Sequence, residues 1–301
     1  MASIKKKGPL QNLKENIIQH IFQLSGFLAV IILLSILALL LSTAVPAFKE
    51  INLKEFFTST RWDPTSPEKP EYGVLSLLVS TLFVTAGALI LAFPVGLAVA
   101  AYLSEVASPK IREILKPVIE LLAAIPSVVI GFIGLNLVGP AIARIFKLSN
   151  GLNALNGSLL LAIMALPTII SLSEDALSAV PFSYVEASLS LGANRFETLI
   201  WVKIPAAISG IVASFMLGMG RAIGETMTVL MATGNARAFP HGFLQSVRTI
   251  TADIAIELGE VPYYTTHYYA LFALGLMLFI MTFLVNLVAD IILEKQKRML
   301  S

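Results

Sequence analysis

Residues 72–104 read YGVLSLLVSTLFVTAGALILAFPVGLAVAAYLS, without one charged side chain. A helix needs about 20 mostly apolar residues to cross the roughly 30 Å hydrocarbon core of a bilayer. This stretch is longer than that, so it predicts a membrane-spanning helix. It does not fit a strand of an outer-membrane barrel, because such strands alternate apolar and polar residues over segments of about ten.

The composition of the whole chain agrees with this interpretation. Of its 301 residues, 56% are hydrophobic and 13% are charged, and the mean hydropathy is +0.83. Soluble domains carry roughly 25% charged residues, so a soluble globular protein is excluded, and the high apolar content excludes a disordered one. The chain has no cysteine, which excludes disulfides, thiolate metal sites and cysteine nucleophiles.

Uncharged windows of similar length recur along the chain, and the one at 204–236 is interrupted only by Arg221 and Glu225. We predict an all-α membrane protein in which residues 1–20 form a cytoplasmic segment and residues 21–301 form a single transmembrane domain. The six predicted spans lie at about 21–43, 74–103, 117–145, 156–177, 205–232 and 268–293.

The distribution of positive charge predicts the orientation. With the N-terminus inside, the inner segments carry twelve lysines and arginines and the outer segments carry eight. Because these residues favour the cytoplasmic side, both termini are expected inside a bacterial plasma membrane. The lysines at 5–7 precede an apolar run, as in a signal peptide, but that run starts late and no A-x-A site follows it, which favours a retained first helix.

Three prolines, Pro94, Pro126 and Pro167, lie inside the second, third and fourth predicted helices. Each removes a helix hydrogen bond and favours a kink. The kinks either shape the bundle or act as hinges, and the sequence does not separate these roles.

The predicted inner loop before the fifth helix, residues 181–205, reads PFSYVEASLSLGANRFETLIWVKIP. Ser183 and Glu186 have the spacing of a capping box, which predicts that a helix begins there. Pro205 is expected to open the fifth membrane helix. The periodicity alone is equally compatible with a short amphipathic helix on the membrane surface.

This loop resembles the EAA motif of ABC-importer permeases, which reads E-A-A-x-x-x-G, nine residues, then I-x-L-P. The matching residues are Glu186, Ala187, Ser188 and Gly192, followed after nine residues by VKIP at 202–205. The departures, Ser188, Val202 and Ile204, are conservative in size. The resemblance implies a type I ABC-importer permease fold whose coupling loop, about 181–204, forms a cytoplasmic coupling helix that docks on an ATPase.

Residues 218–227, GMGRAIGETM, place two charges in the fifth predicted helix. Arg221 and Glu225 are four residues apart, so on a continuous helix they share a face and can pair. An arginine in mid-membrane costs at least about 2.5–3.5 kcal/mol, so it should face the bundle interior or a water-filled path, where its guanidinium suits an oxyanion. Both a substrate pathway and a structural ion pair fit this pattern. Gly220 and Gly224 form a G-x-x-x-G step that predicts close helix packing.

The segment GRAIGETM at 220–227, followed by MATGN at 231–235, also resembles the PstC-type subunits of bacterial phosphate ABC importers. So do WDP at 62–64, YLSE at 102–105, and the longer segments at 119–132 and 156–170. The resemblance implies a permease that pairs with a PstA-type subunit, two copies of a PstB-type ATPase and a periplasmic phosphate-binding protein. Phosphate as the substrate rests on this resemblance, since the charges alone fit any oxyanion.

The chain has no Walker A motif and no catalytic constellation. We therefore expect no enzyme activity, metal or cofactor in it, with ATP used by the partner ATPase. The alternatives are an ABC permease for another oxyanion such as molybdate or sulfate, and a stand-alone anion channel or secondary transporter. The EAA-like loop disfavours the channel and the secondary transporter, because such proteins have no ATPase to dock.

Overall fold

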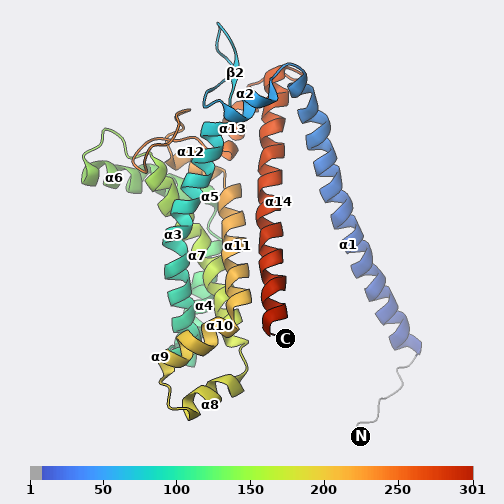
Figure 1. Ribbon diagram of the computed structural model, residues 1–301, viewed down its shortest axis with the longest axis vertical. Helices are drawn as coiled ribbons and strands as arrows, with labels where there is room; N and C mark the ends of the chain where they lie inside the picture. The colour runs from blue at the N-terminus through green and yellow to red at the C-terminus, as the bar shows by residue number, and fades with distance from the viewer. Residues whose placement is uncertain (1–8, 301) are drawn as a thin grey trace.

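The computed structural model describes residues 9–300, which form a bundle of long helices with short elements at both ends (Figure 1). The long helices are α1 (Pro9–Ala44), α3 (Leu75–Glu105), α7 (Ala154–Ser178), α11 (Ile208–Gly224) and α14 (Thr266–Leu300). The shorter helices are η1 (Val45–Lys49), α2 (Leu53–Thr58), α4 (Pro109–Ala123), α5 (Ser127–Ile133), η2 (Gly134–Val138), α6 (Gly139–Phe146), α8 (Phe182–Ser190), α9 (Arg195–Thr198), η3 (Leu199–Lys203), α10 (Ile204–Ala206), α12 (Met227–Ala232) and α13 (Ile250–Glu257). Strands β1 (Trp62–Asp63) and β2 (Glu71–Tyr72) form an antiparallel hairpin with Trp62 opposite Tyr72.

The prediction of an all-α membrane protein is confirmed. Among the described residues, five helical segments are long and apolar enough to cross a membrane: Ile18–Lys49, Leu75–Glu105, Ser127–Phe146, Ala154–Ser178 and Thr266–Ile291. A sixth span exists if Arg195–Ala206 and Ile208–Gly224, which meet at a bend of 71°, are counted as one. The lysines at 5–7 used for the predicted orientation lie outside the described residues.

The predicted third span, 117–145, is not one helix. Pro126 disfavours the helical conformation for the residue before it, so α4 ends at Ala123 and α5 begins at Ser127. The spanning part is therefore 127–146, and α4 is a separate amphipathic helix. Pro94 and Pro167, by contrast, lie inside the continuous helices α3 and α7, as predicted.

The predicted fifth span, 205–232, is also interrupted. Its regular helix begins at Ile208 and ends at Gly224, after which Glu225 has an extended backbone (φ −69°, ψ 132°) and α12 starts at Met227. Pro205 does lie in the first turn of a helix, but that helix is the three-residue α10.

The core of the bundle is built by α3, α7 and α11, which pack through small residues. A Cβ built on Gly96 of α3 would lie 2.7 Å from Ile169 Cγ2, and one built on Gly218 of α11 would lie 2.9 Å from Ile169 Cγ1. Ile169 of α7 is fully buried between them. The two glycines therefore let three helix backbones approach one side chain.

The two ends of the bundle differ (Figure 1). One end, called the hairpin end below, carries β1, β2, α2 and α13; the opposite end, called the α8 end, carries α8, α9 and α10. Helix α1 meets α14 near the hairpin end and stands away from the bundle for much of its length. Its apolar side chains from Ile18 to Leu41 are almost all exposed.

Candidate functional site

The EAA-like residues lie together on the surface of the α8 end. Glu186 and Ala187 are exposed on α8, and Ser188 is half-buried. Gly192 follows the helix with φ +88°, the left-handed conformation that glycine adopts at a helix C-terminus.

The surface around these residues is apolar. The side chains of Phe182, Leu191, Phe196 and Trp201 are each more than two-thirds exposed. Exposed aromatic and aliphatic side chains gathered in one place mark an interaction surface, which the loop presents at the tip of the α8 end (Figure 1).

The capping box predicted at Ser183 and Glu186 is wrong. Helix α8 begins one residue earlier, because the Pro181 carbonyl accepts the Tyr184 N–H at 3.0 Å, which closes the first turn. Ser183 is therefore inside the helix. The capping box of this loop is instead formed by Asn194 and Glu197 at the start of α9.

The expected pairing of Arg221 with Glu225 is also wrong. Glu225 lies past the last turn of α11, and its Oε1 accepts the Thr228 N–H at 3.2 Å, while its carbonyl accepts the Thr251 hydroxyl at 2.7 Å. The four-residue spacing brings charges onto one face only while the helix continues. Within residues 9–300 the half-buried Arg221 has no ion pair, so the structural alternative of a buried pair is not observed.

The G-x-x-x-G step does not pack against this chain. A Cβ on Gly220 or Gly224 would meet nothing within 4 Å in the described part of the chain. Glycines outside this step bring helices together, among them Gly96, Gly210 and Gly218, and none of them belongs to the G-x-x-x-G motif.

A buried charge network at the hairpin end was missed by sequence reasoning. Glu257 accepts hydrogen bonds from Arg237 (2.5 Å), Arg248 (3.0 Å) and the Trp62 indole (3.1 Å), and His267 Nε2 lies 2.8 Å from the same carboxylate. These partners lie up to 195 positions away along the chain. Their sequence spacing therefore gave no signal.

The network shifts the pKa values of its two acids in opposite directions. Burial raises the pKa of the Asp253 carboxyl to about 7, with the Glu257 charge acting in the same direction and Arg248 opposing both. Burial acts on Glu257 in the same direction, but the hydrogen bonds from His267 and Trp62 and the Arg237 charge outweigh it and hold the pKa of Glu257 at about 2. Arg248 donates to both carboxylates at 3.0 Å.

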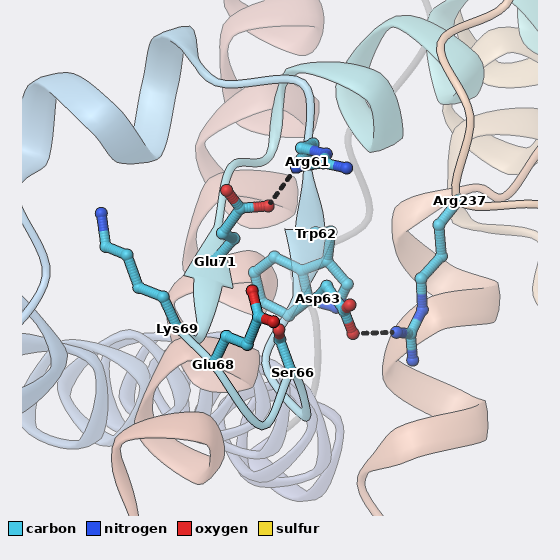
Figure 2. A pocket seen from close by; sticks show the side chains of 8 residues that line it. All are labelled: Arg61, Trp62, Asp63, Ser66, Glu68, Lys69, Glu71 and Arg237. Atoms are coloured by element: carbon cyan, nitrogen blue, oxygen red, sulfur yellow. Dashed lines mark hydrogen bonds and ion pairs between the residues drawn. The ribbon is translucent and has the colours of Figure 1, made fainter.

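A polar cavity of about 410 Å³ opens beside this network. Its lining residues come from the hairpin and from the segment after α12: Arg61, Trp62, Asp63, Ser66, Glu68, Lys69, Glu71 and Arg237. Figure 2 shows Arg237 reaching across to Asp63, which it contacts at 3.0 Å. The β1–β2 hairpin and the segment after α12 thus form one surface.

Two further ion clusters lie toward the α8 end and were not singled out as sites. Glu174 of α7 is fully buried and pairs with Arg112 and Lys116 of α4. Lys203 of η3 is 8% exposed and pairs with Glu105 at the end of α3. The sequence feature that could have indicated these ion clusters is the position of their charges at the borders of the long apolar windows.

Comparison with known proteins identifies the family. Residues 92–298 match the model described as "Binding-protein-dependent transport system inner membrane component". The chain belongs to this family. The permease is 39% identical to the "Probable ABC transporter permease protein YqgH" of Bacillus subtilis, over 81% of this chain and 78% of that one.

Two other relatives cover more of the permease. It is 33% identical to "Phosphate transport system permease protein PstC 2" of Mycobacterium tuberculosis, over 88% of this chain and 87% of the relative. It is 30% identical to PstC of Haemophilus influenzae, over 92% and 93% of the two chains. These relatives identify a PstC-type ABC permease, a multi-pass protein of the inner membrane.

Solved structures show the same fold. A bacterial ABC transporter involved in the import of alginate matches with a TM-score of 0.63 and 15% identity, over 95% of the permease and 98% of that chain. The MetNI methionine ABC transporter matches with a TM-score of 0.55 and 19% identity, over 74% and 94%. At these identities the likeness concerns the fold alone.

Proposed function

We propose that this permease is the membrane subunit of an ATP-driven importer of inorganic phosphate. It forms the translocation pathway with a homologous PstA-type subunit. Two copies of a PstB-type ATPase supply the ATP chemistry, and a periplasmic phosphate-binding protein delivers the substrate. The proposal is supported by the PstC relatives together with an unneutralised arginine within a predicted membrane span.

Arg221 is the residue that suits an anionic substrate, whereas phosphate in particular rests on the PstC relatives. Arg221 lies in the last turn of α11, inside a membrane-spanning segment, and the described residues give it no carboxylate partner. A desolvated guanidinium without a counter-ion is costly unless an anion or water solvates it. Its planar fork matches the oxygens of phosphate, so Arg221 is placed to meet a transiting anion. Glu225, at the helix break four residues on, lines the same part of the pathway.

The orientation follows from the two ends. The α8 end, with Glu186, Ala187, Ser188 and Gly192, faces the cytoplasm and docks on the ATPase through its exposed apolar side chains. Both α1 and α14 have their outer ends toward this side (Figure 1), which supports a cytoplasmic position for both termini. The hairpin end faces the periplasm, and the surface shared by Asp63 and Arg237 receives the binding protein.

The decisive test is uptake of radiolabelled phosphate into vesicles that hold the permease with its partner subunit, ATPase and binding protein. ATP-dependent uptake that resists excess sulfate and molybdate supports the proposal. Uptake of a competitor anion instead would keep the importer and change its substrate. Phosphate flux that persists without ATP or without the ATPase would support a channel.

Replacing Arg221 by glutamine is expected to lower phosphate uptake at least about tenfold, because a charge-assisted contact to phosphate contributes roughly 1.5–3 kcal/mol. The measurement is initial uptake rate per assembled complex. Arg144→Gln is the matched control, since Arg144 is exposed on α6, and its uptake should equal wild type. Wild-type uptake by the Arg221→Gln complex would remove this residue from the pathway.

A further inference from the structure

The coupling loop rejoins the bundle through a bent segment. Helix α9, the π-helical turn η3 and α10 form one arm, Arg195–Ala206, which meets α11 at 71°. We call this arm the elbow. Along the chain, α8 connects to α7 through residues 179–181 and to α11 through the elbow.

The elbow is pinned to α3 by an ion pair. The Lys203 ammonium donates to Glu105 Oε1 across 98 positions of sequence. Lys203 is the last residue of η3, and Glu105 is the last residue of α3. The pair therefore joins the elbow to the end of a core helix that is not its neighbour in the chain.

Each partner depends on the other. Glu105 is an anion at the carboxyl end of a helix, where the helix dipole disfavours negative charge, so it is poorly placed without a nearby cation. Lys203 is buried, with its side chain 10% exposed, and a buried ammonium without a counter-ion is strongly unfavourable. Separating the two side chains therefore leaves each charge in an unfavourable environment.

A second polar contact connects α8 to the elbow. The Ser188 hydroxyl lies 2.9 Å from the Thr198 hydroxyl, and Thr198 is buried at the end of α9. An alanine at position 188, as in the family's motif, cannot form this hydrogen bond. The contacts therefore run from α8 through Ser188 and Thr198 to the elbow, and through Lys203 and Glu105 to α3.

Helix α3 can transmit a displacement of the elbow to the other core helices. It packs along α7 and contacts α11, and the inner apolar cluster that includes Ala100, Leu177 and Ile211 joins these three helices. The Arg112, Lys116 and Glu174 cluster joins α4 to α7 and includes no residue of the coupling loop.

We infer that Lys203 and Glu105 are positioning residues that make the elbow and α3 move as one body when the ATPase displaces α8. This inference rests on the proposed function, because it assumes an ATPase docked at α8. Without the pair, the elbow keeps the apolar packing of Leu199 and Ile204 against the cluster that includes Ala100. Less of the displacement of α8 then reaches α3, so ATP hydrolysis proceeds with less transport.

The test compares Lys203→Gln, Glu105→Gln and the exchanged pair Lys203→Glu with Glu105→Lys in the complete reconstituted complex. The readout is phosphate transported per ATP hydrolysed. Each single variant should lower this ratio about tenfold, equivalent to about 1.4 kcal/mol, and the exchanged pair should restore much of it. Lys116→Gln is the control, since Arg112 still pairs with Glu174, and its ratio should equal wild type.

A second measurement does not depend on the substrate. The chain has no cysteine, so spin labels can be placed at Ser190→Cys on α8 and Val95→Cys on α3, both of which are exposed. With ATPase bound, the label-to-label distance should stay the same with and without nucleotide in the otherwise unchanged chain. It should change with nucleotide in Lys203→Gln.

The outcomes separate the two claims. A wild-type complex that binds the ATPase but takes up no phosphate contradicts the proposed substrate and leaves the distance test valid. Single variants with wild-type coupling ratios, or with losses that only track the amount of assembled complex, overturn the inference. So does a nucleotide-independent distance in Lys203→Gln.

Discussion

Glu257 shows what a single residue contributes at the hairpin end. Its carboxylate is 6% exposed and holds hydrogen-bonding groups from β1, the segment after α12 and the start of α14. A buried carboxylate is tolerated when its oxygens are paired and hydrogen-bonded. Here one side chain fixes three parts of the chain to α13.

Glu257→Gln is expected to destabilise the permease by about 3 kcal/mol, because removing one partner of a buried ion network is strongly unfavourable and leaves Arg237 with Asp63 and Arg248 with Asp253 as their carboxylate partners. Thermal unfolding of the purified protein in detergent measures this. The matched control is Glu71→Gln at the exposed Arg61–Glu71 pair, 3.6 Å apart, where the change should stay below about 1 kcal/mol. Equal effects of the two substitutions would contradict the role assigned to Glu257.

Asp253 makes the folding stability of the hairpin end depend on pH. Its pKa is raised from 3.8 to about 7 by burial and by the Glu257 charge, so the folded state binds this proton more tightly than the unfolded state. The stability that this group contributes is therefore present below about pH 4 and is lost as pH rises through 7.

Asp253→Asn is expected to remove that dependence. The unfolding temperature of Asp253→Asn minus that of wild type should therefore be larger at pH 8 than at pH 5. Thermal unfolding in detergent at the two pH values, with Glu71→Gln carried alongside, checks this. A constant difference between Asp253→Asn and wild type across the range would show that Asp253 does not titrate there.

Residue-level predictions succeeded where they rested on local chemistry and failed where they assumed a continuous element. Pro94 and Pro167 lie inside the helices that the apolar windows predicted. Arg221 and Glu225 do not pair, since the helix ends between them. The Glu257 network could not be predicted, because its members meet only after distant segments fold.

At the level of helices, apolar length located the spans but not their interruptions. Helices α3 and α7 begin and end within two residues of the predicted ranges, whereas α14 extends seven residues past the predicted end at 293. The breaks before Ser127 and after Gly224 fall inside uncharged or nearly uncharged windows, where hydropathy gives no signal. Pro126 was visible in the sequence, but Pro94 and Pro167 remain within continuous helices, so proline alone does not predict a break.

Gly96→Ala tests how the three core helices pack. The added Cβ would lie 2.7 Å from Ile169 Cγ2, and a β-branched side chain in a helix has little rotamer freedom to move aside. Overpacking of this kind costs about 1–3 kcal/mol, measured as a loss of unfolding free energy in detergent.

Gly220→Ala is the matched control for Gly96→Ala. Position 220 is also helical, but nothing in the described chain lies within 4 Å of the added atom. Alanine is the better helix former by about 1 kcal/mol, so stability should hold or rise. A destabilisation as large as that of Gly96→Ala would mean that the G-x-x-x-G step packs after all.

On the scale of the whole molecule, composition and the family motifs predicted the class of protein, and the matched relatives confirm it. What they could not predict is the uneven burial of the spans. Helix α7 is largely enclosed, whereas the described part of α1 is exposed along almost its whole length. In a lone chain that apolar surface meets lipid, and in the proposed complex other subunits can cover part of it.

The charge network around Glu257 also bears on how the polypeptide is made. Trp62 leaves the ribosome early, whereas His267 lies in α14, which is made after the other partners of Glu257 because chains are synthesised from the N-terminus. The network therefore cannot be complete until α14 has been made and has packed. A translation product that stalls before α14 leaves Glu257 without His267. An intact network is thus a marker that α14 has taken its place in the bundle.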